Sequence, residues 1–122
     1  MPDQPGQHKR RWRFYRTASG HEPVRALISQ LSLVDQAAIF GAMKDAEREG
    51  LQAARHLRGS IYEVRVTGSA QNFRILFATE GHFSQILLAL EAFSKKTQKT
   101  PPQAIVLAES RLADWRHRSN QP

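Results

Sequence analysis

The sequence contains no cysteine, which excludes disulfide bonds, cysteine-based zinc sites and thiol nucleophiles. It also lacks a long apolar run. The longest, residues 86–92, is interrupted by Glu91 and falls far short of the roughly 20 residues that a membrane span needs. The polar N-terminus shows no apolar core of a secretory signal. From these absences we expect a cytoplasmic protein with no membrane partner.

Acidic residues are scarce relative to basic ones. Against 18 Lys and Arg there are 11 Asp and Glu, which gives a formal net charge of +7 and a pI near 10.6. The excess is unevenly spread, because residues 22–50 are slightly acidic. It is concentrated in residues 9–16, in residues 55–74 and in Lys95, Lys96 and Lys99. This distribution indicates a surface directed at a polyanion such as nucleic acid.

The chain has 122 residues, a length at which one domain with a modest core is expected. Residues 1–10 are predicted to be a flexible basic tail and residues 119–122 a second short tail. Residues 11–118 then form the single domain.

Period-two alternation of apolar and polar residues predicts four strands. In the first, residues 11–17, Trp12 and Phe14 face one way and Arg13 and Tyr15 the other. The other three are residues 61–67, 72–79 and 83–93. The last of these is apolar at every position from 86 to 90, which is typical of a central strand covered on both faces.

Apolar residues at helical spacing predict two N-terminal helices and one C-terminal helix. Ser19 and Glu22 have the spacing of a capping box before the first. The second is expected from Ser32 to Gly50, and the last has Thr100 as its expected N-cap. The order of elements predicts an α+β fold: a small, mostly antiparallel sheet with the N-terminal helical hairpin on one face, and a C-terminal helix.

Two arginines are predicted to share the face of the sheet opposite the helical hairpin. If the apolar faces of the strands meet the helices, Arg65 and Arg74 project together from an open face, and Glu63 lies on that same face. Further side chains would line or close this surface: Lys95, Lys96, Lys99, Arg13 and Tyr15. A guanidinium donates paired hydrogen bonds to phosphate and stays charged, so this surface would bind phosphate.

Each of these features also has an ordinary structural interpretation. Isolated arginines are common on the exposed face of a sheet, and the lysine segment fits a solvated turn. His56 precedes the basic strands and either faces the predicted groove or has a structural or surface role. The histidines show no metal-ligand spacing, and no phosphate loop, dinucleotide motif or nucleophile elbow occurs, so we expect neither a metal nor a cofactor.

Three segments of the C-terminal half occur in a distinctive order. They are YEVRV (residues 62–66), NFRILF (72–77) and AFSKKTQKTPP (92–102), the last directly before a predicted helix. In this order they resemble the RelE/HigB toxin superfamily, and in particular its phage-derived HigB-like branch. The resemblance covers residues 11–116 and is most specific in the FSKKTQKTPP segment.

The resemblance implies a RelE-like fold and a type II toxin that cuts mRNA, usually in the ribosomal A site. Such toxins are neutralised by a small antitoxin, which for HigB-like proteins is typically a helix-turn-helix (HigA-like) protein. Arg65 and Arg74 match the basic strand positions of the family, and Lys95 or Lys96 matches the basic residue that ends the last strand. Lys99 belongs to the branch motif.

One departure from the family pattern concerns acid–base chemistry. RelE proper has a tyrosine just after the basic loop, where this sequence has Pro101 and Pro102. The acid–base pair of RelE therefore does not transfer. Lys95, Lys96, His56 and Tyr15 remain as alternatives for proton transfer.

The expected function is that of a metal-independent endoribonuclease (an mRNA interferase) that causes growth arrest. The RNA 2′-hydroxyl would attack the adjacent phosphate. The expected catalytic residues are Arg65, Arg74, Lys95 and Lys96, and the expected substrate-binding residues are Lys99, Arg13, Tyr15 and His56. The alternatives are a non-nucleolytic ParE-like toxin that inhibits gyrase, an inactive relative that only binds antitoxin, and a plain nucleic-acid-binding domain.

Overall fold

The structure is a computed structural model that describes residues 9–95 and 99–119. Lys96 and most of the two predicted tails lie outside the described residues. None of the described helices is long and apolar enough to cross a membrane.

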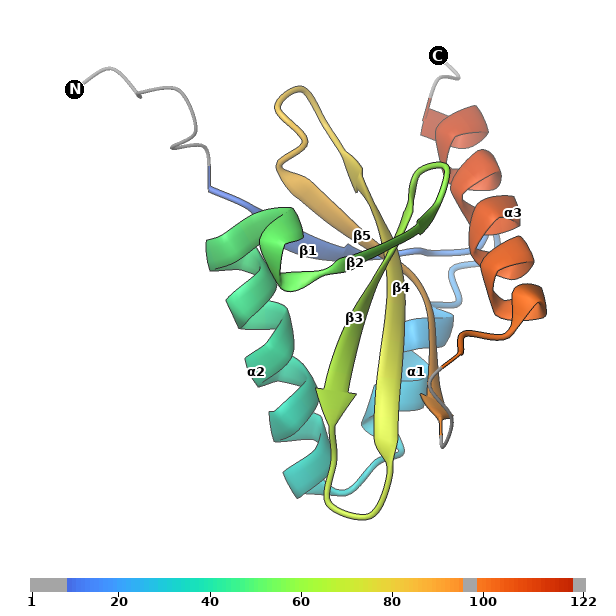
Figure 1. The fold of residues 1–122 in the computed structure, drawn as a ribbon. Coiled ribbons are helices and arrows are strands. Elements are labelled where there is room, and N and C mark those ends of the chain that lie inside the picture. Colours follow the sequence, from blue (N-terminus) through green and yellow to red (C-terminus); the bar gives the residue numbers. More distant parts are fainter. Residues whose placement is uncertain (1–8, 96–98, 120–122) are drawn as a thin grey trace.

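The core of the molecule is a five-stranded sheet with the order β1-β5-β4-β3-β2 (Figure 1). Strand β1 runs parallel to β5, and every other neighbouring pair is antiparallel, which confirms the mostly antiparallel sheet. The strands are β1 (Arg11–Phe14), β2 (Arg55–Arg58), β3 (Ile61–Thr67), β4 (Asn72–Glu80) and β5 (Ile86–Lys95). Strand β1 ends three residues earlier than its alternation predicts.

Strand β2 was not predicted from the sequence. Its four residues, RHLR, are charge-rich and carry no apolar alternation, so the pattern in the sequence indicates no strand. It forms by pairing with β3, where Arg55 lies opposite Glu63. A tertiary contact therefore determines this strand, and it brings Arg55 beside residues of the predicted site.

Helices α1 (Pro23–Ser29) and α2 (Leu33–Glu49) pack on one face of the sheet, as predicted. Ser32 caps α2 by accepting a hydrogen bond from the Asp35 amide, and Gly50 ends it with a φ of 66°, which favours glycine. A short 3₁₀ helix, Gly50–Ala53, leads on to β2. The predicted capping box before α1 is wrong: Glu22 is itself the N-cap and forms an ion pair with Arg25.

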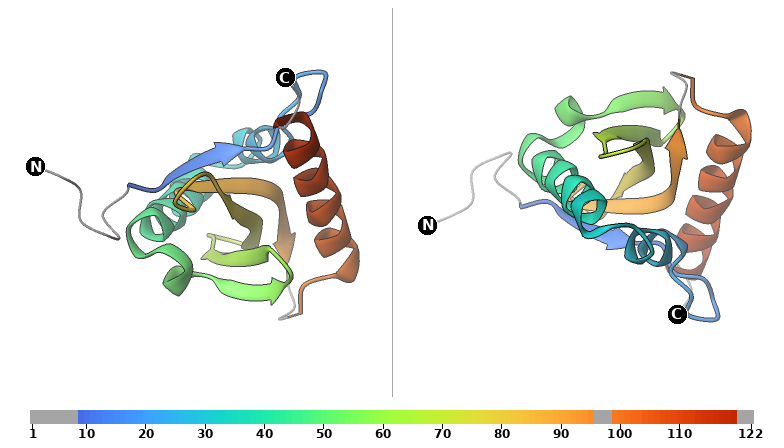
Figure 2. Two further views of the ribbon diagram at one scale, coloured as in Figure 1. Left: turned by 90° about the horizontal axis from the view of Figure 1, so that it is seen from above. Right: turned by 90° about the horizontal axis from the view of Figure 1, so that it is seen from below.

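Helix α3 (Pro102–Ser119) crosses the opposite face of the sheet (Figures 1 and 2). It begins two residues after Thr100, so Thr100 is not its N-cap. Ala108 and Leu112 of α3 pack on apolar side chains of that face: Ile61, Leu76, Ala78, Leu88 and Leu90. The prediction that this face is open is therefore wrong over most of the sheet. The ends of β3 and β4 extend beyond α3 (Figure 1).

Strand β5 is buried on both faces, as its uninterrupted apolar run predicts. Leu87 and Ala89 belong to the core under α1 and α2, whereas Leu88 and Leu90 belong to the core under α3. The sheet is thus a middle layer, with α1 and α2 on one face and α3 on the other.

Candidate functional site

The pairing of β3 with β4 places Arg65 directly opposite Arg74. Side chains alternate along a strand, so Glu63, two residues before Arg65, lies on the same face. Strand β2 adds Arg55 opposite Glu63. The register thus gathers three arginines around one carboxylate on the α3 side of the sheet.

The carboxylate of Glu63 is completely buried and fully engaged. Its Oε1 lies 2.9 Å from Nε of Arg65 and 3.1 Å from Nε of Arg74. Its Oε2 accepts a hydrogen bond from the hydroxyl of Thr100. We call Glu63, Arg65, Arg74 and Thr100 the Glu63 cluster. A buried carboxylate is tolerated only when it is paired in this way.

The two arginines of the Glu63 cluster differ in exposure. The side chain of Arg65 is 37% exposed, whereas that of Arg74 is 6% exposed. The prediction that both project from an open face is therefore wrong for Arg74. Arg74 lies between Arg65 of β3 and Phe93 of β5, and the segment before α3 contacts the cluster through Thr100. Arg65 can meet a ligand from solvent, and Arg74 supports the cluster from within.

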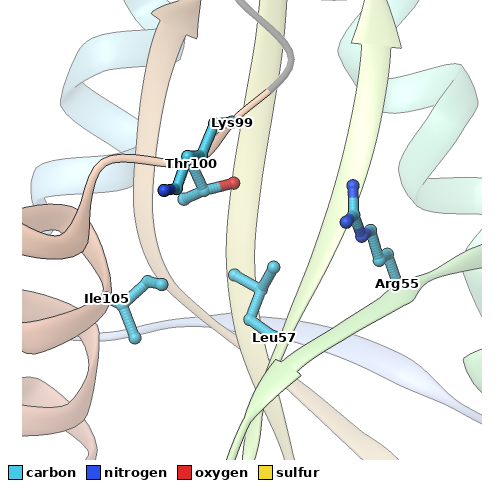
Figure 3. Close-up of a pocket in the computed structure, with 5 residues that line it drawn as sticks. All are labelled: Arg55, Leu57, Lys99, Thr100 and Ile105. Carbon is cyan, nitrogen blue, oxygen red and sulfur yellow. The ribbon is translucent and has the colours of Figure 1, made fainter.

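A cavity of about 400 Å³ adjoins the Glu63 cluster at Thr100. Figure 3 shows Arg55 on one side of it and Lys99 with Thr100 on the other. The apolar side chains of Leu57 and Ile105 complete its wall. The cavity therefore combines cations with an apolar surface.

The electrostatics of this region favour an anion. Arg55, Arg65, Arg74 and Lys99 bring four positive charges, and Glu63 is the carboxylate that pairs with two of them. Guanidinium groups donate directional hydrogen bonds to phosphate oxygens, and a lysine ammonium adds a point charge. The arrangement suits an anion such as a phosphate next to an apolar group.

Lys95 and Lys99 lie at the end of the sheet where the Glu63 cluster lies. Lys95 is the last residue of β5, and its backbone lies opposite Asn72 at the start of β4. Two residues earlier, Phe93 lies opposite Arg74. Lys99 lines the cavity. Lys96 lies outside the described residues.

His56 is not part of this region. Its ring packs on Tyr62 with the centroids 4.9 Å apart, and its Nε2 lies 2.9 Å from the backbone oxygen of Gly59. Tyr62 in turn packs against the core beneath α1 and α2. His56 therefore lies on the opposite face of the sheet from Arg65.

Arg13 and Tyr15 are also separated from the Glu63 cluster. Tyr15 is buried under α3, and its hydroxyl donates a 2.6 Å hydrogen bond to Asp114. Burial, reinforced by that hydrogen bond, raises the pKa of Tyr15. The Arg13 guanidinium lies over the Trp115 ring, 5.4 Å from its centre. Both contact the C-terminal half of α3, whereas the Glu63 cluster lies before its N-terminal end.

Three members of this region were not predicted as site residues: Glu63, Thr100 and Arg55. Glu63 had a usable signal, since alternation places this single acid on the same face as Arg65. In the sequence Thr100 has the spacing of a helix N-cap, and this pattern gives no sign of its contact with Glu63. Arg55 has no such signal, because strand β2 shows no apolar alternation in the sequence.

The fold and this region define a small α+β protein with a cationic cavity beside a buried, arginine-paired carboxylate. The family model described as phage-derived Gp49-like protein matches residues 26–113, and the chain belongs to this family. The chain is also similar to proteins named "Probable endoribonuclease HigB1" from Mycobacterium tuberculosis strains CDC 1551 and H37Rv. Each is 32% identical over 108 residues, which cover 86% of this chain and 84% of the relative. These findings confirm the resemblance to RelE/HigB toxins.

Proposed function

We propose that this protein is the toxin of a type II toxin–antitoxin pair and cuts mRNA as an endoribonuclease. The cationic cavity beside Arg65 carries the proposal, because it offers a phosphate two exposed cations and an apolar wall. Membership of the Gp49-like family and the names of the similar proteins support it.

Arg65, Arg55 and Lys99 bind the phosphate at the cleaved bond. They stabilise the negative charge that grows on its oxygens, an effect that usually dominates catalysis of this kind. Arg74 and Glu63 are positioning residues: they hold the Arg65 guanidinium in place through the shared Glu63 oxygen. Thr100 fixes the other oxygen of Glu63 and the segment that carries Lys99.

The substrate supplies its own nucleophile. The 2′-hydroxyl attacks the adjacent phosphorus, the bond from phosphorus to the 5′-oxygen breaks, and a 2′,3′-cyclic phosphate remains on one product. This step needs no enzyme nucleophile and no metal ion. A base must take the 2′-proton and an acid must protonate the leaving 5′-oxygen.

We assign proton transfer to Lys95 or Lys96. Arginine does not exchange its proton under these conditions, and His56 lies on the other face of the sheet. That lysine, as a neutral amine, takes the 2′-proton and, once it is an ammonium, gives a proton to the leaving 5′-oxygen. Acid–base chemistry of this modest kind fits a toxin that cuts mRNA on the ribosome, which positions the RNA. We also propose that a helix-turn-helix antitoxin neutralises this toxin in the cytoplasm, as the resemblance to HigB-like proteins implies.

Primer extension on cellular mRNA after induction tests the proposal. The wild type should produce new 5′ ends at the onset of growth arrest, and Arg65→Ala should produce none at equal protein level. Arg48→Ala is the control, because Arg48 is exposed at the end of α2 and pairs with Asp45. Growth arrest with intact mRNA would overturn the proposal and favour gyrase inhibition.

A second experiment tests the chemistry. Purified toxin is added to translating ribosomes with an mRNA that carries a single 2′-deoxy nucleotide at the mapped cleavage site. Cleavage should be lost at that site alone and should persist in EDTA once ribosomes are held intact by polyamines. Cleavage of the 2′-deoxy message would exclude attack by the 2′-hydroxyl.

A further inference from the structure

A second cationic cavity, of about 340 Å³, lies along β1 between α1 and α3. Three consecutive residues of β1 line it: Trp12, Arg13 and Phe14. Successive side chains of a strand point to opposite faces, so a cavity in contact with all three lies against the edge of the strand. Arg25 of α1 and Trp115 of α3 form its two sides.

The outer edge of β1 presents backbone groups for pairing. Strand β1 is at the end of the sheet order and pairs with β5 alone. The amides of Arg11 and Tyr15 donate to the β5 side, to Gln85 and Ala89, at 2.9 Å each. Backbone groups alternate in direction along a strand, so the N–H and C=O groups of Trp12 and Phe14 point away from β5. No other described strand lies beside them.

Charge and aromatic rings surround this edge. Arg13, Arg16 and Arg25 line the cavity, and the acid among its lining residues is Glu22. The Arg13 guanidinium lies over the Trp115 ring, and that of Arg25 lies 4.8 Å from the centre of the Phe14 ring. Stacking of this kind restrains a guanidinium while N–H groups stay available at the ring edge. Arg25 also pairs through Nε with Glu22 at 3.0 Å, so its two terminal nitrogens are the ones that a ligand would meet.

We propose that the outer edge of β1 binds an extended acidic segment of another protein. The segment adds a strand to the sheet, and its carboxylates meet Arg13 on the α3 side and Arg25 on the α1 side. Addition of a strand to an exposed sheet edge is a general mode of peptide recognition, in which main-chain hydrogen bonds give affinity and side-chain pockets give specificity. Exposed edges of this kind are otherwise a liability for aggregation.

The backbone favours a peptide over RNA as the occupant. Trp12 and Phe14 each offer a C=O as well as an N–H toward the cavity. An extended peptide matches both, because it carries donors and acceptors in alternation. The phosphodiester groups of RNA carry acceptors only, and its donors, the 2′-hydroxyls and base amino groups, do not alternate with acceptors at the repeat of a β-strand. The edge is also separate from the Glu63 cluster, because its cavity is lined by Trp115 in the C-terminal half of α3, whereas Thr100 of the cluster precedes the N-terminal end of that helix.

Fluorescence anisotropy with the full-length protein tests the proposal. The probe is a fluorescein-labelled peptide of alternating glutamate and valine, about seven residues long to match a short strand. A second peptide has the same sequence but N-methyl groups on the amides that would pair with β1. It keeps every charge and loses the donors, so it should bind at least about tenfold more weakly. Equal binding of the two peptides would overturn strand addition.

Substitutions in the protein locate the site. Arg13→Glu should weaken the glutamate–valine peptide by about tenfold or more, whereas Arg48→Glu, with the same charge change on α2, should leave affinity within about twofold. Amide NMR signals of Trp12 and Phe14 should shift on binding to the wild type, which identifies the edge without any variant. Absence of binding or of these shifts contradicts the proposal. The proposal is also contradicted if a single-stranded RNA displaces the peptide and if Arg13→Glu weakens RNA binding as much as peptide binding. The edge of β1 would then bind nucleic acid.

Discussion

Arg65 and Arg74 face each other across β3 and β4, and the Nε atom of each lies within ion-pair distance of the same atom, Oε1 of Glu63. One carboxylate thus serves two guanidinium groups, and the cluster keeps a net positive charge. Their exposures differ, at 37% and 6% for the side chains, and so do the expected effects of replacing them. We therefore expect replacement of the exposed arginine to affect ligand binding and replacement of the buried one to affect the stability of the cluster.

Arg65→Ala should remove activity and leave the fold intact. Loss of one donor to the negative charge that develops on the phosphate oxygens lowers the cleavage rate by roughly 10²-fold or more. The free energy of unfolding should change little in comparison, because Glu63 keeps Arg74 and Thr100 as partners. The measurements are cleavage rate on ribosomes and urea unfolding of the same preparations. A folded Arg65→Ala protein with wild-type rate would exclude Arg65 from the site.

Arg74→Ala should instead destabilise the protein. Removing one partner of a buried ion pair costs about 3–5 kcal/mol, because the remaining charge stays buried with less compensation. Adding Glu63→Gln to Arg74→Ala should recover part of that loss, since the double variant no longer buries the charge. Urea unfolding of the two single variants and the double variant gives the coupling energy. Strict additivity would show that the two side chains do not interact.

Thr100→Val should also weaken the fold. The substitution keeps the shape of the side chain and removes the hydroxyl that donates to Glu63. A hydrogen bond to a charged group contributes about 1.5–3 kcal/mol, so the free energy of unfolding should fall by that amount. Thr67→Val, at an exposed position of β3, is the matched control and should stay within about 0.5 kcal/mol of the wild type. Equal stability of the two variants would exclude the Thr100 bond as a stabilising contact.

Arg55→Ala should lower RNA affinity in a salt-dependent way. Each phosphate contact that is lost reduces the slope of log affinity against log salt by about 0.7 for single-stranded RNA. Arg58→Ala removes the same charge from the same strand, but Arg58 pairs with Glu109 at 2.6 Å and does not line the cavity. The slope of log affinity against log salt for Arg58→Ala should therefore match that of the wild type. A titration of binding over a range of salt concentrations distinguishes the two, and identical slopes for both variants would exclude a phosphate contact by Arg55.

Tyr15 should ionise at unusually high pH. Its pKa is raised above the ordinary value of 10.0, first by burial and then by the hydrogen bond to Asp114. The folded state therefore holds this proton more tightly than the unfolded state. That contribution to stability is complete below pH 10 and is lost as pH rises through the pKa of the folded protein.

The measurement is an ultraviolet titration of tyrosinate in Tyr62→Phe, which leaves Tyr15 as the single tyrosine. In this background Asp114→Asn should move the Tyr15 titration back toward its ordinary pKa, since it removes the acceptor charge. A Tyr15 that titrates at its ordinary value in the folded Tyr62→Phe protein would contradict the buried bond.

Much of the fold follows from local patterns in the sequence. Ser32 and Gly50 mark the ends of α2, and the apolar residues of β5 correctly indicate a strand covered on both sides. Patterns of this kind fail where a tertiary contact decides the structure. Strand β2 exists through its pairing with β3, and Thr100 contacts a buried carboxylate instead of capping a helix.

The candidate site was predictable in part. Alternation alone places Arg65, Arg74 and Glu63 on one face, and the register confirms that Arg65 and Arg74 are neighbours. Periodicity does not show which segments of the chain pack over that face, so it does not predict that Arg74 is buried. Periodicity also does not show near which end of α3 a residue lies. Arg13 and Tyr15 contact its C-terminal half, away from the cluster, and the sequence pattern gives no sign of this separation.

The parallel pairing of β1 with β5 joins the start of the domain to a strand that is made much later. While the nascent chain leaves the ribosome, Trp12 and Phe14 have no strand to lie against until residues 86–89 have been synthesised. Contacts between segments so distant in sequence form late and slowly. A truncated translation product would thus lack a complete sheet, and the newly made protein would acquire its native architecture only near the end of its own synthesis.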